Sequence, residues 1–316
     1  MEKNIVEKQA HRDLPRGIYP MLYAFWTGSG RLDEEAMALQ VEHAVDAGAD
    51  GVAVLGLVTE SHRLDVAERL ALVRTVSRLL DKRLPYSVTV TGETPDAQRD
   101  FATAAIAEGA DWLILQPPLQ TVVDEAQLID FFAAIAEDCD CQLGVQNNPE
   151  HLRNAFTSDG LLRLHKSVPR ITIAKAEGPV VNVEPLIAAT AGSLSSFGGH
   201  GGIEHIRLLR AGADGLIPAP DCLPLQVRIQ SLWRDGSEDA QNEAIAIEEE
   251  LLPLIVFMNR SIDVLLCYGR QFMARRLGLR TTFDRLGKLQ PTAFGMKETD
   301  RLFEKLRRTE DRFLTN

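Results

Sequence analysis

The sequence contains few cysteines, no surplus of positive charge and no long apolar run. None of its apolar runs approaches the roughly 20 residues that a helix needs to span a bilayer. The first residues, MEKNIVEKQAHRDLPRG, contain no apolar core of a signal peptide. We therefore expect a cytoplasmic protein without a membrane partner.

The four cysteines are too few for a disulfide scaffold in a chain of 316 residues. Cys139 and Cys141 form a Cys-Asp-Cys pair, but no second pair follows at the spacing that a zinc site needs. We expect reduced structural thiols, with neither a metal nor a cofactor.

The charge of the chain argues against a nucleic-acid partner. The 34 Lys and Arg residues are outnumbered by 45 Asp and Glu residues, which gives a formal net charge of -11. Binding to a phosphate backbone depends on a positive field, so we expect no nucleic-acid partner. Hydrophobic residues make up 45% and charged residues 25%, the balance of a globular protein with ample material for a core.

Three segments of the sequence repeat one pattern: residues 47–56 (AGADGVAVLG), 108–117 (EGADWLILQP) and 211–220 (AGADGLIPAP). In each, an apolar-periodic helix ends at a glycine, which can adopt the left-handed C-cap conformation. An acidic residue then precedes a short, almost continuously apolar run. Strands that are apolar on both faces belong in a parallel sheet covered by helices, so the pattern predicts repeated βα units.

Five further strands are predicted between these segments, near residues 17–23, 86–90, 142–146, 171–175 and 194–198. Helical periodicity fills the intervals. Eight alternations over about 220 residues predict an α/β fold, a (β/α)8 TIM barrel spanning residues 1–235. Residues 236–316 are predicted to form a C-terminal helical extension packed as part of the same unit, because their apolar stripes must be buried against the barrel or another subunit.

Lys175 is the candidate catalytic residue. In a barrel of this kind the active site lies at the C-terminal ends of the strands, and Lys175 ends the apolar run of residues 171–174. A strand that enters a core seldom closes with an unpaired charge. Burial favours a neutral amine, which is the nucleophile that forms a Schiff base with a ketone or an aldehyde. The structural alternatives are a lysine that reaches solvent or one that pairs with Glu177.

Three motifs of the sequence resemble those of one enzyme family. They are residues 55–61 (LGLVTES), residues 146–149 (QNNP) and Lys175. The dihydrodipicolinate synthase and N-acetylneuraminate lyase family has a Gly-Thr-Thr-Gly-Glu-like loop, a Tyr-Asn-x-Pro motif and a Schiff-base lysine at these places. The resemblance covers nearly the whole chain. It implies a lyase or aldolase, or a related synthase or dehydratase, that acts on pyruvate or another 2-oxo acid through Lys175. It also implies a homo-oligomer, either a tetramer or a dimer.

The sequence departs from the family at two of these motifs. Gln146 stands where the family has the tyrosine that shuttles protons, and an amide does not titrate near neutral pH. Leu57 and Val58 replace the two hydroxyl residues of the carboxylate-binding loop, and only Thr59 keeps a hydroxyl. These departures disfavour dihydrodipicolinate synthase activity itself. They favour a dehydratase, or an aldolase for a less polar substrate.

Three groups within loop reach are candidates for the missing proton carrier: Glu177, His200 and Tyr23. Each also has a structural explanation, because the glutamate can pair with the lysine, the histidine can cap a glycine loop and the tyrosine can pack in the core. The resemblance further implies the residues that bind the substrate. These are Val58, Thr59, Gln146, Gly199 and Ile217.

Two other functions stay open at this point. The missing tyrosine is compatible with a non-catalytic relative that binds a small ligand or serves as an oligomeric scaffold. Residues 198–202 (GGHGG) precede a helix, so their backbone N–H groups could hold an anion at its N-terminus. That reading predicts a phosphate-binding barrel enzyme without imine chemistry.

Overall fold

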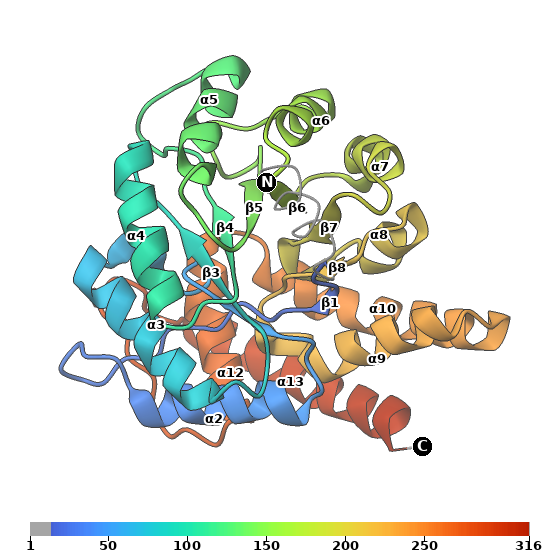
Figure 1. Ribbon diagram of the computed structural model, residues 1–316. Coiled ribbons are helices and arrows are strands. Elements are labelled where there is room, and N and C mark those ends of the chain that lie inside the picture. Colours follow the sequence, from blue (N-terminus) through green and yellow to red (C-terminus); the bar gives the residue numbers. More distant parts are fainter. Residues whose placement is uncertain (1–13, 316) are drawn as a thin grey trace.

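The computed structural model describes residues 14–315 and contains a barrel of eight parallel strands (Figure 1). The strands are β1 (Gly17–Ile18), β2 (Val52–Val54), β3 (Tyr86–Val90), β4 (Trp112–Leu115), β5 (Gln142–Asn147), β6 (Ile171–Ala176), β7 (Ser195–Gly198) and β8 (Gly215–Leu216). They pair in the order β1-β8-β7-β6-β5-β4-β3-β2, and a parallel bridge between Met21 and Ala53 joins the two ends of this order. The predicted (β/α)8 fold is confirmed.

Eight helices alternate with the strands and surround them (Figure 1). They are α2 (Glu34–Asp46), α3 (Val66–Leu80), α4 (Pro95–Ala107), α5 (Glu125–Ala136), α6 (Ser158–Ser167), α7 (Val180–Ala189), α8 (His205–Ala211) and α9 (Leu223–Asp235). Local chemistry fixes where they begin. Asp65 and Asp124 start α3 and α5 with capping boxes, in which each carboxylate accepts a hydrogen bond from the third helical N–H.

The aspartates of the three repeated segments tie each helix-to-strand turn to the neighbouring strand. Each carboxylate accepts a hydrogen bond of 2.7–2.9 Å from a backbone N–H of that strand: Asp50 from Ile18, Asp111 from Tyr86 and Asp214 from Ser196. Hydrogen bonds to a charged acceptor are stronger than neutral ones. The repeated Gly-Ala-Asp sequence therefore helps to fix the register of the barrel.

The C-terminal extension packs on one side of the barrel, as the orange and red helices of Figure 1 show. It consists of α10 (Glu238–Met258), α11 (Ile262–Val264), a π-helical turn (Leu265–Gly269), α12 (Arg270–Arg276) and α13 (Ala293–Leu314). Helix α10 contacts α8 and α9, and α13 contacts α9, α10 and α12. The extension therefore buries its apolar residues against the barrel and against itself.

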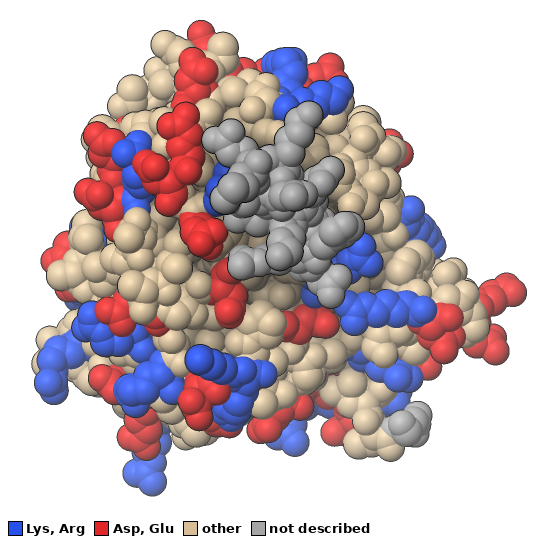
Figure 2. All heavy atoms as spheres, viewed as in Figure 1, with Lys and Arg blue, Asp and Glu red and all other residues tan. Residues whose placement is uncertain are grey.

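The surface mixes charges of both signs. Acidic and basic side chains are interspersed over the described part of the face in Figure 2. Some form ion pairs across helices, as Arg74 does with Glu108. Among the described helices, no single one is long and apolar enough to cross a membrane. Helix α10 and the segment Ile262–Arg276, bent by 103°, reach that length and composition only as a pair.

Candidate active site

Lys175 lies near the C-terminal end of β6, with its side chain buried. In the sheet it is paired with Gln146 of β5 and Phe197 of β7. Only 8% of the side chain is exposed, and its Nζ lies 3.4 Å from Oε1 of Glu177. A buried ammonium is costly unless it has a partner, and this carboxylate provides one. The structure therefore places a potential nucleophile beside a titratable group.

Lys175 lines a small cavity of about 50 Å³ at the C-terminal ends of the strands. The cavity has an apolar side, formed among others by Leu57, Val58, Ile217, Ile262 and Leu265. Its polar side chains are Asn148, His151, Lys175, Glu177, His200 and Asn259. Three of the lining residues, Asn259, Ile262 and Leu265, follow α10 in the chain, so the C-terminal extension completes the wall of the cavity.

Glu177 is the centre of a buried hydrogen-bond network. Its Oε2 accepts hydrogen bonds from the side-chain amides of Gln146, at 2.7 Å, and Asn148, at 3.1 Å. Burial alone raises the pKa of Glu177, but the charges of Lys175 and His200 and these two donors outweigh it. The pKa of this carboxyl therefore lies below its usual range. Glu177 is a carboxylate that can accept a proton.

The amide of Gln146 has both of its ends engaged. Its oxygen accepts a hydrogen bond of 2.6 Å from Gln116, and its nitrogen donates to Glu177. Gln146 occupies the position at which the resemblance implies a tyrosine. An amide in this place orients the carboxylate but does not itself exchange a proton. Gln146 therefore reaches the site through Glu177, and it is not among the residues that line the cavity.

Three predicted substrate-binding residues, Val58, Thr59 and Ile217, differ in whether they line the cavity. Val58 and Ile217 line the cavity together with Lys175. Thr59 does not line it, because its fully buried hydroxyl donates a hydrogen bond of 2.7 Å to the backbone oxygen of Leu22. The Thr59 hydroxyl is thus engaged by a local hydrogen bond, and its part in substrate binding stays a prediction.

The glycine loop at residues 198–202 packs around a carboxylate. A Cβ atom at Gly199 would lie 2.0 Å from Oε1 of Glu177, so the absence of a side chain makes room for that group. The following helix, α8, has seven residues and begins at His205. The side chain of the preceding residue, Glu204, accepts a hydrogen bond from the N–H of Val180. Two carboxylates beside such a loop disfavour a bound phosphate.

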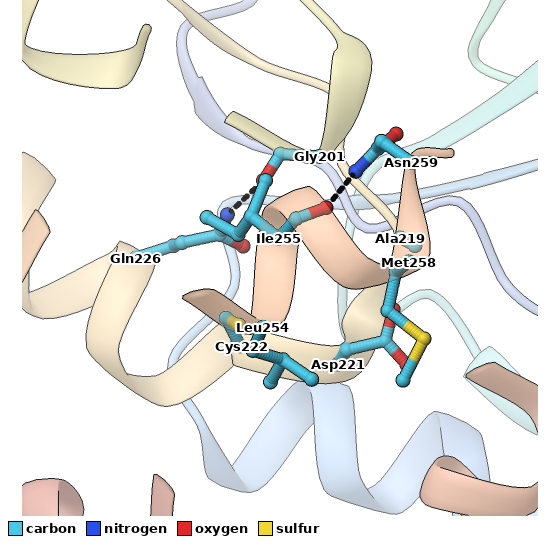
Figure 3. Close-up of a pocket in the computed structure, with 9 residues that line it drawn as sticks. All are labelled: Gly201, Ala219, Asp221, Cys222, Gln226, Leu254, Ile255, Met258 and Asn259. Carbon is cyan, nitrogen blue, oxygen red and sulfur yellow. Dashed lines mark hydrogen bonds between the residues drawn. The ribbon is translucent and has the colours of Figure 1, made fainter. Parts of the chain in front are cut away.

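Tyr23 is not among the residues that line the Lys175 cavity. Its hydroxyl donates a hydrogen bond of 3.0 Å to Asp221, and neither residue reaches the solvent. Burial raises the pKa of Asp221 to about 7 and, with Asp221 beside it, raises the pKa of Tyr23 well above its usual value. Asp221 lines a separate pocket against α10 (Figure 3). This contact gives Tyr23 a structural role, and its candidacy as the proton carrier stays a prediction.

His200 lies in the cavity wall and has an uncommon backbone conformation. Its φ is +51°, in the left-handed region that residues with a Cβ atom seldom adopt. The ring packs edge-on against His151, with 5.7 Å between the centroids. Among the described residues, none forms a hydrogen bond with Nε2 of His200.

The loop after β2 is attached to the C-terminal extension by a buried ion pair. Glu60 has a φ of +60° and pairs with Arg270, and the two side chains are only 1% and 3% exposed. Trp26 also donates a hydrogen bond to Glu60, at 3.1 Å. Arg63 bridges Glu60 and Asp284, at 2.7 and 3.2 Å. This network fixes the loop that contributes Leu57 and Val58 to the cavity.

Sequence reasoning missed several residues of the cavity. Asn148 and His151 follow β5, so their position after a strand was a usable signal. Asn259, Ile262 and Leu265 had no such signal. They reach the cavity only because the extension folds back over the ends of the strands.

Comparisons with known proteins show which family the chain resembles. The chain is 28% identical over 257 residues to the L-2-keto-3-deoxyarabonate dehydratase of Azospirillum brasilense. The aligned region covers 79% of this chain and 82% of that protein. Another relative is a 4-hydroxy-tetrahydrodipicolinate synthase of Salinibacter ruber, 26% identical over 254 residues, with 77% of this chain and 80% of that protein covered. At the level of the family, these relatives are lyases and synthases.

Solved structures share the fold. YagE of Escherichia coli K12 in complex with pyruvate superposes with a TM-score of 0.84 at 22% identity, covering 93% of this chain and 99% of that one. The sequence profile of the dihydrodipicolinate synthetase family matches residues 14–267, which is most of the chain. The protein therefore belongs to the dihydrodipicolinate synthetase family.

Proposed function

We propose that the protein is a Schiff-base lyase, of the dehydratase or aldolase type, that acts on pyruvate or another 2-oxo acid through Lys175. The observation that carries this proposal is the distance of 3.4 Å between Lys175 Nζ and Glu177 Oε1 inside a buried cavity. A nucleophile and a proton acceptor side by side are the minimal equipment for imine chemistry. Membership of the family supports the same reading.

The first step is the formation of the imine. The neutral amine of Lys175 attacks the keto carbon of the substrate. The keto oxygen takes one proton from the attacking nitrogen and one from the solvent, and it leaves as water. The product is a protonated C=N bond, which draws electrons from the adjacent carbon. The cavity limits the access of water around this bond because most of its wall is buried.

Glu177 takes the place of the missing tyrosine in the second step. In a dehydration, its carboxylate removes a proton from C3 of the imine, and the electron pair moves to the nitrogen to give an enamine. The enamine then expels the oxygen on C4, which receives the proton from Glu177 and leaves as water. The hydrogen bonds from Gln146 and Asn148 hold the carboxylate in position for both transfers.

The proposed substrate is a 2-oxo acid that fits an apolar cavity wall. Leu57, Val58 and Ile217 give the cavity an apolar side, which supports a less polar substrate or one with few hydroxyl groups. The relative from Azospirillum brasilense is named a dehydratase for a keto-deoxy sugar acid. We therefore place 2-keto-3-deoxy acids beside pyruvate in the first panel of substrates.

Borohydride reduction in the presence of this panel tests the proposal. We expect a reduced adduct on Lys175, located by peptide mass mapping and abolished in Lys175→Ala. Lys166, an exposed lysine of α6, provides the matched control, and Lys166→Ala should leave the adduct unchanged. If folded protein gives no adduct with any member of the panel, the lyase proposal fails. A non-catalytic role in ligand binding or as a scaffold is then favoured.

A further inference from the structure

Glu150, His151 and His200 gather beside the Lys175 cavity from two different loops. One potential ligand atom of each residue lies within 4.8 Å of the others. His151 and His200 also line the cavity. The side chains of Glu150 and His151 are exposed, and that of His200 is half-buried. We propose that these three residues bind a divalent transition-metal ion of the zinc class. This inference goes beyond the proposed imine chemistry and does not depend on it.

The donor set determines the kind of ion. Two imidazoles and one carboxylate suit zinc, nickel, cobalt or copper, whereas calcium and magnesium prefer sites made only of oxygen atoms. Zinc binds imidazole nitrogen at about 2.0–2.1 Å and carboxylate oxygen at about 2.0–2.2 Å, so ligands around one ion lie about 3–3.5 Å apart. A separation within 4.8 Å is close enough for small side-chain rotations to complete the site. Three protein ligands leave a coordination position open for water or another oxygen ligand.

The loop that holds His200 is fixed before any ion binds. Gln226 donates a hydrogen bond of 2.7 Å to the backbone oxygen of Gly201 (Figure 3). The N–H of Gly202 donates to the oxygen of Gly199 at 2.9 Å. These contacts hold His200 in the left-handed conformation, and such strain is found mainly where the surrounding structure enforces it, often at functional sites.

The opposite loop is fixed by Asn148. Its side-chain oxygen accepts a hydrogen bond of 3.1 Å from the N–H of His151, and its amide nitrogen donates to Glu177. The backbone oxygen of Asn148 also accepts from His151, at 3.2 Å. His151 therefore belongs to a turn attached to the buried network. Ligands on two fixed loops lose little conformational entropy when an ion binds.

His200 has a ring nitrogen available for a ligand. Its Nε2 has no hydrogen-bond partner among the described residues, although it is shielded from solvent. A buried polar atom without a partner is uncommon and calls for an explanation, such as an ion. Coordination by a metal provides that partner. His200 thus belongs to the cluster of three potential ligands and also has a ring nitrogen without a described hydrogen-bond partner.

Calorimetric titration of zinc chloride into the untagged, full-length protein tests the site. We expect one saturable equivalent in the wild type. His200→Asn should weaken binding by at least ~10-fold, because loss of partners that only orient a ligand already costs about 10–100-fold. Asparagine tolerates the left-handed conformation, so this variant keeps the loop. His151→Gln and Glu150→Gln should each weaken binding as well.

His165 provides the matched control, because its ring already contacts Ile171 and Ser193 on another part of the surface. His165→Gln should bind zinc as the wild type does, and circular dichroism should show every variant folded. The absence of a saturable site in the wild type overturns the proposal. So does zinc binding that His151→Gln and His200→Asn leave unchanged. The titration needs no 2-oxo acid, so its result is separate from the test of the lyase.

Discussion

Gln146 donates a hydrogen bond of 2.7 Å to Glu177. The pair combines a residue that stands where the resemblance implies a tyrosine with a carboxylate 3.4 Å from Lys175. Because Gln116 fixes the other end of the amide, the donor points toward the carboxylate. The loss of the tyrosine is thus accompanied by a buried carboxylate at the same lysine. This arrangement leads to the first two predictions.

Glu177→Gln should separate imine formation from turnover. Glutamine keeps the shape of the side chain but cannot accept and return a proton, so turnover should fall by about 10²–10⁴-fold. Lys175 remains, and the borohydride adduct with pyruvate should still form. Both quantities are measured on the same preparation. Full turnover in Glu177→Gln would rule out Glu177 as the proton carrier.

Gln146→Leu should move the pH dependence of kcat/KM. The amide donor helps to lower the pKa of Glu177, together with Lys175, His200 and Asn148, so its removal raises that pKa. A base works only when ionised, and the acidic limb of the profile should therefore shift to higher pH. Gln127→Ala, in the exposed first turn of α5, is the control and should not shift the limb. An unshifted limb in Gln146→Leu contradicts the prediction.

Asp221→Asn should remove one source of pH-dependent stability. The pKa of Asp221 is raised by burial from 3.8 to about 7 in the folded protein. Between these values the folded state holds a proton that the unfolded state has lost. The free energy of unfolding therefore falls as the pH rises from about 4 to 7, by on the order of 4 kcal/mol. Asparagine does not titrate, so the variant lacks this fall.

Urea unfolding of the wild type and Asp221→Asn at pH 5 and pH 8 measures the effect. Other groups titrate in both proteins, so the difference between their pH dependences isolates Asp221. Tyr23 keeps a hydrogen-bond partner in the asparagine side chain. If both proteins lose the same free energy of unfolding between the two pH values, Asp221 does not hold a proton in the folded state.

Arg270→Met should destabilise the protein strongly. The substitution removes the most buried partner of Glu60 and leaves that carboxylate to Arg63 and Trp26, and breaking a buried ion pair costs about 3–5 kcal/mol. Arg74→Met, which removes an exposed pair with Glu108, is the control and should have a much smaller effect. The double variant Glu60→Gln, Arg270→Met should recover part of the loss. Urea unfolding at constant pH provides the comparison, and a loss equal to that of the control contradicts the prediction.

Much of the barrel could be predicted because its signals are local. The repeated Gly-Ala-Asp segments encode a helix end, a turn and a buried strand within ten residues, and Asp50 shows why the aspartate recurs. Lys175 could be singled out for a related reason. A charged residue at the end of an apolar run can be recognised in the sequence alone. The barrel topology places the C-terminal ends of all strands at one face.

The roles of individual side chains were less predictable. Thr59 and Val58 are neighbours in the sequence, yet the hydroxyl of Thr59 bonds to the backbone of Leu22 and the side chain of Val58 lines the cavity. Tyr23 follows β1 in the chain and Lys175 lies near the end of β6, but the hydroxyl of Tyr23 bonds to Asp221, which does not line the Lys175 cavity. A sequence shows that a group is near an active face. The direction of the side chain depends on partners that are distant in the chain.

The sequence by itself determined the helix ends, the buried strands, their alternation and the exceptional position of Lys175, because these depend on neighbouring residues. Only the tertiary structure decided which groups share the cavity. Glu177 accepts a hydrogen bond from Gln146, and Asn259 of the extension lines the cavity. The rings of His151 and His200, from two different loops, pack against each other. Such contacts join residues that are far apart in the chain, and no local pattern encodes them.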